Sequence, residues 1–403
     1  MRFNRELKER SIEINLQIEN TVRNIIQDVR LNGDSALKKY NEKFDKYTGD
    51  FLMKPEVVED PRFMEILNRA KQQITEFHIN QINKGFELKK ENGVIMGQFT
   101  RPIKRVAVYV PGGKASYPSS VLMNVLPAQI AGVKEIAVFT PDPSNEVLMA
   151  CKVCGIESIY KIGGAQAIAA ATYGTESIKK FDKIVGPGNI YVATAKKQVV
   201  GDIGIDMIAG PSEVLVIADE KANPCYIAAD LMSQAEHDEM AKAILITTSS
   251  KIIEETEKEI EKQIQSLSRK AIIESSLSNY SSAILVNSIE EAIDLSNDIA
   301  PEHLELLVED PFKYIDLVEN AGSVFLGENS PEPLGDYMSG TNHVLPTSGT
   351  AKFYSPLGVY DFMKVSCYSY YPKEVLETFK EDVVEFANRE GLSAHANSLK
   401  VRF

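Results

Sequence analysis

An alternation of short apolar segments with helical patterns constrains the fold of this chain more than any other feature. From residue 105, the segments RVAVYV, EIAVF, SIYKIGG and KIVGPG are each followed by a stretch with helical spacing. A second series starts at residue 213 with EVLVIAD and continues through AILITT, AILVNS, LELLVE and SVFLG. Strands that alternate with helices are typical of βαβ units on a parallel sheet. The sequence therefore predicts an α/β fold with two Rossmann-like parallel-sheet domains in tandem, over about 105–212 and 213–327.

The segments that flank these two series are predicted to be helical. Residues from about 11 to 90 carry apolar side chains at helical spacing, and the tail at 373–400 indicates two short helices. Between them, residues 328–357 form a long Gly/Pro/Ser-rich loop whose histidine and aromatic content favours a functional role. We expect residues 1–104 to pack with 213–357 as a first domain. Residues 105–212 then form a second domain, and 358–403 form a small helical C-terminal segment.

Charge and apolar patterning narrow the class of protein. The 403 residues carry a formal net charge of −13, which argues against an extended nucleic-acid footprint. No apolar run is long enough to span a bilayer, and the charged start MRFNRELKER lacks the apolar core of a signal peptide. We therefore expect a cytoplasmic protein with no nucleic-acid or membrane partner.

Cysteine usage leaves a small ambiguity. Cys151 and Cys154 form a C-x-x-C, a spacing found in redox and metal sites. Their surroundings are apolar and helical and no second pair stands nearby, so buried free thiols are the favoured interpretation. The four cysteines of a cytoplasmic protein are expected to be reduced.

Histidines are few, and most lie in polar settings. His78 sits within an amphipathic helical pattern and is expected to be structural, whereas the other four are His237, His303, His343 and His395. In SQAEHDE, Gln234 and His237 would share one helix face. Asp336 and His395 could complete a nitrogen and oxygen site that suits zinc. A solvated helix face explains the same spacing, and spacing alone favours that alternative.

Two further signals are ambiguous when taken alone. Glu302 and His303 follow Pro301 and precede an apolar strand, so they are either an acid/base pair or the polar start of a buried segment. Glycine turns at 110–114, 161–168 and 185–190 stand where parallel sheets bind phosphates or dinucleotides. None matches G-x-G-x-x-G, and generic α/β turns look alike.

Taken together, these blocks are similar to the histidinol dehydrogenase family. The resemblance runs from GDSALKKYNEKFDK to LSAHANS and includes YVPGGKASYPSSVLMNVLPAQIAG, GGAQAIAAATYGTESI, DKIVGPGN, AGPSEVLVIAD, SQAEHD, APEHL, AGSVFLG and GDYMSGTNHVLPT, in the family's order. It implies a zinc-dependent oxidation of L-histidinol to L-histidine by two NAD+, through histidinaldehyde, as the last steps of histidine biosynthesis. It also implies that 105–212 is the NAD-associated domain.

The resemblance also implies specific roles for residues of this chain. Zinc would be held by Gln234, His237, Asp336 and His395, and Glu302 and His303 would transfer protons. NAD would contact Tyr109, Gln166 and Asn189. Substrate would contact Ser212 and Glu390, together with His303 and the four zinc ligands. The family forms homodimers with shared active sites, in which the C-terminal segment crosses to the partner.

Two departures and three alternatives remain. Ala300 replaces a more usual glycine before the catalytic pair, a change that we expect to be tolerated. The chain also starts later than many members, which predicts fewer dimer contacts there. The alternatives are a related zinc- and NAD-dependent polyol dehydrogenase, a zinc hydrolase that uses Glu302 to activate water, and a non-catalytic metal-binding or scaffold protein.

Overall fold

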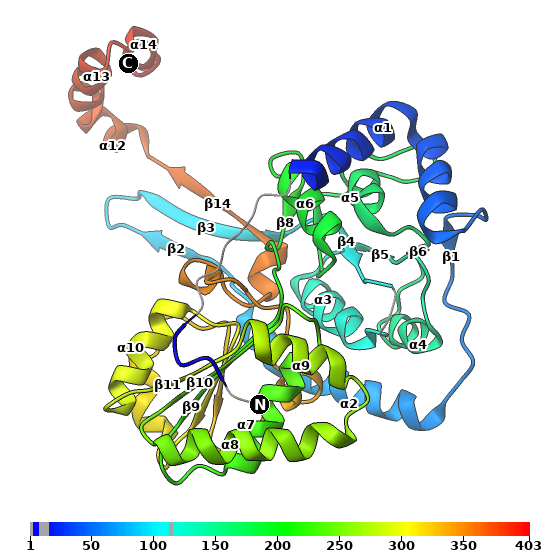
Figure 1. Cartoon of the computed structure of the whole chain (residues 1–403). Coiled ribbons are helices and arrows are strands. Elements are labelled where there is room, and N and C mark those ends of the chain that lie inside the picture. Colours follow the sequence, from blue (N-terminus) through cyan, green and yellow to red (C-terminus); the bar gives the residue numbers. More distant parts are fainter. Residues whose placement is uncertain (1–2, 8–15, 113–115) are drawn as a thin grey trace. The chain divides into compact units, whose positions relative to one another are not determined.

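The computed structural model of this chain describes residues 3–7, 16–112 and 116–403. The chain divides into two compact units, one within residues 1–81 and 103–362 and one made of 82–102 and 363–403. The first unit contains two largely parallel sheets with helices around them (Figure 1). The predicted α/β class with parallel sheets is confirmed. Residues 11–15 of the predicted N-terminal helices, and 113–114 of the first glycine turn, lie outside the described residues.

The first sheet has six strands in the order β1-β6-β5-β4-β7-β8. Five of them are parallel, and only β1 pairs antiparallel, with β6. The strands are β1 (Leu52–Met53), β4 (Arg105–Tyr109), β5 (Glu135–Phe139), β6 (Ile159–Tyr160), β7 (Lys183–Val185) and β8 (Gly204–Ile205). Their apolar runs are continuous because helices cover both faces of the sheet.

Helices α1 (Leu16–Tyr40), α5 (Gly164–Tyr173) and α6 (Ile190–Gln198) cover one face of the first sheet. Helix α3 (Pro118–Ala131) contacts β4 and β5, with α4 (Asn145–Val153) packed beside it, and α2 (Pro61–His78) packs on both helices. His78 is completely buried, and its Nδ1 lies 2.8 Å from the Ile74 carbonyl oxygen. This contact supports the structural role predicted for His78.

The packing of α1 differs from our expectation that residues 1–104 would join 213–357. Its buried residues Val22, Ile25 and Val29 share a core with Ala107 and Phe139 of the first sheet. Near the N-terminus, Asn4 forms a bridge with Ser282 of the second sheet. Helical spacing shows that α1 has an apolar stripe, but the stripe is equally suited to either sheet.

The second sheet has five parallel strands in the order β11-β10-β9-β12-β13. These strands are β9 (Glu213–Ala218), β10 (Lys242–Thr247), β11 (Ser282–Leu285), β12 (His303–Leu307) and β13 (Ser323–Leu326). As in the parallel part of the first sheet, the first strand along the chain is central. The next two strands lie on one side of it, and the last two lie on the other.

Side chains alternate across the second sheet to form two cores. Val214 and Val216 point to the face covered by α7 (Pro224–Ala235), α8 (Ser250–Gln263) and α9 (Lys270–Asn279), whereas Leu215 and Ile217 point to α10 (Ile289–Ile299). The segment predicted as a loop contains a short helix, α11 (Glu332–Tyr337). Gln234 of α7 and Glu332 of α11 both approach His303 at the start of β12, where the candidate site lies.

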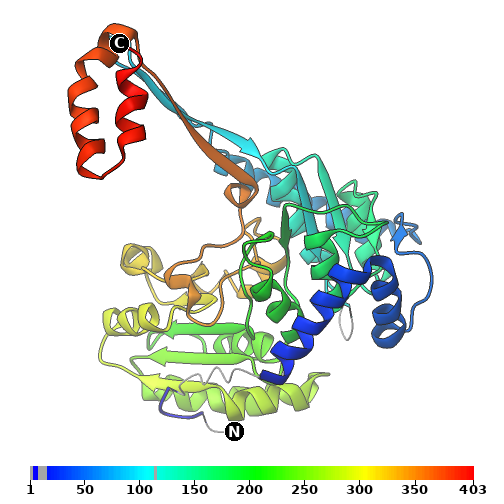
Figure 2. The same cartoon turned by 90° about the horizontal axis from the view of Figure 1, so that it is seen from above.

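The second unit contains a three-stranded antiparallel sheet in the order β14-β3-β2. Its elements are β2 (Phe86–Lys89), β3 (Ile95–Pro102), β14 (Met363–Tyr370), α12 (Lys373–Thr378), α13 (Lys380–Arg389) and α14 (Ser393–Lys400). Helices α13 and α14, at the red end of the colour range in Figure 2, pack against each other.

This sheet corrects the prediction of purely helical N-terminal and C-terminal segments. Strand β14 contains one Val and two Tyr, residue types that favour strands, yet most of its side chains are exposed in this chain. Without a buried face it lacks the apolar alternation by which a strand is recognised. Three helices follow it, rather than the predicted two.

Cys151 and Cys154 are free and buried. Burial raises the pKa of Cys154 to about 12 and also raises that of Cys151, so both thiols stay protonated and unreactive. The prediction of buried free thiols is therefore confirmed. Within residues 3–7, 16–112 and 116–403, no helix combines the length and the apolar content needed to cross a membrane.

Candidate active site

The start of strand β12 carries Glu302 and His303, and the neighbouring strand β9 holds both. The parallel pairing of the two strands sets His303 opposite Val214. The backbone N–H of Glu213 donates to Glu302 Oε2 at 2.9 Å, and the Glu213 carbonyl oxygen lies 2.9 Å from His303 Nδ1. Both side chains are buried. One residue of β9 therefore fixes the two residues that the sequence marked as a possible acid/base pair.

The protonation of His303 follows from its partners. Nδ1 also lies 2.8 Å from the amide nitrogen of Gln234, so it can donate to the Glu213 carbonyl or accept from this amide, but not both at once. When Nδ1 donates to the carbonyl, Nε2 keeps its lone pair. Nε2 lies 3.8 Å from Glu332 Oε1. In that tautomer the imidazole offers a base on the side of α11.

Burial shifts the pKa values of this pair in opposite directions. Burial lowers the pKa of His303 to about 4, although the charge of Asp336 opposes that change, so the imidazole is neutral near pH 7. Burial also raises the pKa of Glu302 well above its usual value, and the charges of Glu213, Asp336 and Glu332 raise it further. Two adjacent groups with such displaced pKa values are typical of sites for proton transfer.

A potential cation site adjoins the pair. His303, Glu332 and Asp336 each offer a ligand atom, and these atoms lie within 4.8 Å of one another. Burial and the nearby Asp336 raise the pKa of Glu332 to about 9. Glu332 Oε1 and His343 Nε2 are buried without a hydrogen-bond partner. These two atoms are potential metal ligands that are buried without a partner. A divalent cation would bind them and would offset the repulsion between the neighbouring carboxylates.

Further buried carboxyl groups lie behind this cluster. Glu305, two residues after His303 on the same face of β12, accepts a hydrogen bond from the Glu332 backbone N–H at 2.9 Å. It also hydrogen-bonds with Asp230 on α7, whose pKa burial raises to about 6. Glu305 thus connects the strand that carries His303 to the two helices that carry Gln234 and Asp336.

The predicted zinc ligands fall into two groups. Gln234 is buried on α7, and His237 follows the end of that helix and is an exposed residue. Burial nevertheless lowers the pKa of His237, while the charge of Asp336 acts in the opposite direction. The structure therefore brings Gln234, His237 and Asp336 close to His303. His395 belongs to the second unit, where it is exposed on α14.

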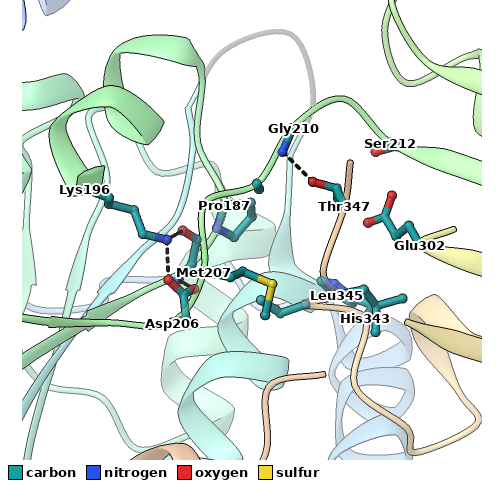
Figure 3. Close-up of a pocket in the computed structure, with 13 residues that line it drawn as sticks. Pro187, Lys196, Asp206, Met207, Gly210, Ser212, Glu302, His343, Leu345 and Thr347 are labelled. Atoms are coloured by element: carbon teal, nitrogen blue, oxygen red, sulfur yellow. Dashed lines mark hydrogen bonds and ion pairs between the residues drawn. The ribbon is translucent and has the colours of Figure 1, made fainter. Parts of the chain in front are cut away.

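A cavity of about 90 Å³ adjoins Glu302 (Figure 3). Glu302 and Ser212 lie toward one end, and Lys196 and Asp206 lie toward the other. Residues 343–347 complete its wall, and Thr347 Oγ1 accepts a hydrogen bond from the Gly210 backbone N–H at 2.6 Å. The predicted substrate residue Ser212 therefore shares a cavity with the predicted catalytic residue Glu302.

The predicted NAD residues lie at or after the carboxyl ends of strands β4, β6 and β7 of the first sheet. Tyr109 ends β4, and its hydroxyl accepts from the Gly164 backbone N–H at 3.0 Å. Gln166 is buried on α5, with Oε1 lacking a hydrogen-bond partner. Asn189 caps α6 by accepting from two backbone N–H groups. Gly164 has a φ of +61°. The unpartnered Gln166 Oε1 beside this glycine turn is a polar atom that a cofactor could contact.

Glu390, the remaining predicted substrate residue, follows α13 in the second unit and is exposed.

Comparison with known proteins identifies the family. A family model described as histidinol dehydrogenase matches residues 8–403. The histidinol dehydrogenase of Lactococcus lactis subsp. lactis is 57% identical over 408 residues, covering 98% of this chain and 95% of the relative. The chain belongs to the histidinol dehydrogenase family. It is therefore an enzyme of the oxidoreductase class, as the sequence resemblance predicted.

Two further relatives agree with this assignment. The histidinol dehydrogenase of Clostridium acetobutylicum is 51% identical over 417 residues, covering 100% of this chain and 96% of the relative. The crystal structure of the histidinol dehydrogenase from Elizabethkingia anophelis matches with a TM-score of 0.92 at 39% identity. That match covers 99% of this chain and 94% of the other.

Several residues of the site were not predicted from the sequence. Glu332 stands four residues before Asp336, a helical spacing that could have signalled it. Glu305 follows His303 at strand spacing but lies within an apolar run. Ala300, which we expected to be tolerated, is buried with a φ of +52°. Glycine adopts this left-handed conformation without strain, which explains why glycine suits this position.

We predict that Thr347→Val destabilises the protein. Valine has nearly the same shape but cannot accept the hydrogen bond of the Gly210 N–H, so a buried donor loses its partner. The free energy of unfolding should fall by about 1–3 kcal/mol. Thr347→Ser keeps the acceptor and serves as the control in thermal or denaturant unfolding. Equal stability of Thr347→Val and the wild type would contradict the assigned contact.

Proposed function

We propose that this enzyme oxidises L-histidinol to L-histidine through histidinaldehyde, with two NAD+ and a bound zinc ion. Family membership supports the reaction, because the relatives are themselves histidinol dehydrogenases. The observation that carries the mechanism is a neutral, buried imidazole at His303 beside Glu302 and the carboxylates of α11. The two sheets, with their equivalent strand orders, are proposed to be tandem Rossmann-like domains.

His303 is proposed to act as the base in both oxidations. The alcohol must lose its hydroxyl proton as hydride leaves the carbon. The Nδ1–H of His303 donates to the Glu213 carbonyl oxygen, so Nε2 has a free lone pair. Nε2 accepts the hydroxyl proton of the alcohol. The imidazolium returns this proton to the carbonyl oxygen as water adds to the aldehyde, so the same nitrogen is free to accept a proton when the hydrated aldehyde is oxidised. Because its pKa is lowered, the ring stays unprotonated and ready at neutral pH.

Glu302 is proposed to handle the hydrating water. The aldehyde must add water to form a gem-diol before it can lose a second hydride. A carboxylate with a raised pKa is a stronger base than an ordinary one, which suits removal of a proton from this water. The hydrogen bond from the Glu213 N–H orients Oε2, and Glu302 also lines the cavity.

The proposed zinc ligands are Gln234, His237 and Asp336, together with His395 of a second chain. Imidazole, carboxylate and amide donors suit zinc, and the unpartnered Glu332 Oε1 beside Asp336 is consistent with a cation there. When bound, the ion would supply a positive charge that orients the substrate's nitrogen donors. Glu332, as a neighbour of Asp336, would hold that ligand in place.

NAD is proposed to contact Tyr109, Gln166 and Asn189 at the carboxyl end of the first sheet, and it would supply the hydride acceptor. Substrate is proposed to contact Ser212 and Glu390 in addition to His303 and the metal ligands. Glu390 offers a carboxylate that could pair with the cationic amine or imidazole of histidinol.

A homodimer with shared active sites is proposed for the quaternary structure. In this arrangement, Glu390 and His395 complete the site of the partner. The exposure of both residues in the single chain is consistent with that role.

The decisive assay follows NADH absorbance while the purified protein is incubated with L-histidinol and NAD+. We expect two NADH for each histidine formed. Exhaustive chelation should reduce turnover by at least about 100-fold, because a catalytic metal contributes several kcal/mol, and added zinc should restore it. A zinc hydrolase would form no NADH, and a polyol dehydrogenase would favour uncharged alcohols. Full activity after verified metal removal would contradict the zinc assignment.

Shared sites predict complementation between inactive variants. A heterodimer of His303→Ala and His395→Ala subunits would contain one site with both residues intact. Random mixing after subunit exchange should therefore restore about a quarter of wild-type activity. The matched control mixes His303→Ala with Glu302→Gln, both in the first unit, and should restore nothing. Absence of activity in verified His303→Ala/His395→Ala heterodimers would exclude the shared-site arrangement.

A further inference from the structure

Lys196 and Asp206 form an ion pair at the end of the cavity opposite Glu302 and Ser212, and neither residue takes part in the proposed proton transfers or zinc binding. Only 3% and 1% of the two side-chain surfaces are exposed. Lysine and aspartate are rarely buried to this extent, and removing two charges from water costs several kcal/mol per ion. Apolar side chains of similar size would fill the same space at lower cost. The position of the pair therefore calls for an explanation beyond packing.

Both members of the pair bind one residue, Gly186. Lys196 Nζ donates to the Gly186 carbonyl oxygen at 3.1 Å, and Asp206 Oδ2 accepts from the Gly186 N–H at 2.7 Å. The two charges thus satisfy both backbone polar groups of a single buried residue. Gly186 has a φ of +110°, and a Cβ there would overlap the carbonyl oxygen of Tyr109. A side chain at position 186 would therefore be strained, and the ion pair binds the backbone of Gly186 on both sides.

Gly186, which both members of the ion pair bind, lies next to residues that are proposed to contact NAD. It begins the turn between β7 and Asn189, the residue that caps α6 and is proposed to contact NAD. Tyr109, whose carbonyl oxygen adjoins Gly186, is a second proposed NAD contact. Lys196 lies on α6 itself, two helical turns after Asn189. Asp206 follows β8 and leads toward Ser212 on the opposite side of the cavity (Figure 3).

We propose that Lys196 and Asp206 are positioning residues for NAD, whose ion pair fixes the 186–189 turn in the form that binds the dinucleotide. This inference rests on the proposed function, because it takes the turn as part of the NAD site. The pair acts on the cofactor through the backbone of Gly186 and need not touch it. Because the two charges cancel, the turn is held without adding net charge beside a cofactor that carries charges of both signs.

The chain offers a matched control in Lys183. This lysine on β7 is also buried, with 7% of its surface exposed. Its Nζ donates to the Asp361 carbonyl oxygen at 2.7 Å and lies 3.4 Å from the Asp361 carboxylate. Lys183 is not among the residues that line the cavity. Loss of its charge should disturb the same sheet to a similar degree without altering the 186–189 turn.

The test compares Lys196→Met, Lys196→Met/Asp206→Asn and Lys183→Met with the wild type. The double variant removes both charges, so it avoids an unpaired buried carboxylate and should fold even if the single variant does not. Fluorescence titration with NADH, in the absence of substrate, measures cofactor binding directly. Melting temperature measures stability, and steady-state kinetics give separate KM values for NAD+ and histidinol.

We expect the dissociation constant of NADH to rise at least about tenfold in both Lys196 variants, equivalent to about 1.4 kcal/mol of binding free energy. The KM for NAD+ should rise with it, whereas the KM for histidinol should stay within about twofold. Lys183→Met should melt at a lower temperature but bind NADH within about twofold of the wild type.

The outcomes separate this inference from the proposed function. If the wild type and the folded double variant bind NADH equally, the positioning role is wrong while the proposed function stands. An equal loss of NADH binding in Lys183→Met would show that any buried charge in this sheet has the same effect, and would overturn the role as well. A wild type that neither binds NADH nor oxidises histidinol would overturn the proposed function, and the inference with it.

Discussion

The backbone of Glu213 is the element on which the candidate active site depends. Its N–H binds the Glu302 carboxylate and its carbonyl oxygen binds the His303 imidazole, both at 2.9 Å. Adjacent residues in a strand point to opposite faces, which would separate an acid/base pair. Glu302 escapes this alternation because it precedes β12, whereas His303 is its first residue. The parallel register of β9 and β12 thus lets the consecutive side chains of Glu302 and His303 both bind the backbone of Glu213.

The site concentrates buried acidic groups that would destabilise an ordinary core. Burial raises the pKa values of Glu302, Glu305 and Glu332, so it costs free energy to keep these groups charged as they are in water. Such an arrangement is costly unless a cation or a reaction uses it. The proposed zinc ion would bind near these acidic groups, and the proposed proton transfers would use Glu302. At the other end of the cavity, the buried Lys196–Asp206 ion pair is proposed to hold the backbone of Gly186 in place.

The sequence predicted the two parallel sheets well, because strands covered on both faces appear as continuous apolar runs such as EVLVIAD. Strand β14 was not predicted because most of its side chains are exposed within the chain. The sheet on which α1 packs could not be predicted because an apolar stripe on a helix can pack on either sheet. Gln234, Asp336 and His395 were candidates by residue type, and family resemblance assigned them as zinc ligands. Glu305 was missed because its role depends on the Glu332 N–H, which only the folded chain brings beside it.

The division of labour between Glu302 and His303 is the central claim, and product analysis of a single turnover tests it most directly. Rapid mixing of Glu302→Gln with histidinol and NAD+ should give a first NADH, then a stalled second NADH with histidinaldehyde accumulated. His303→Asn should slow both NADH-forming steps by about 100-fold or more. Formation of both NADH at wild-type rates by Glu302→Gln, or near-normal turnover by His303→Asn, would contradict the account.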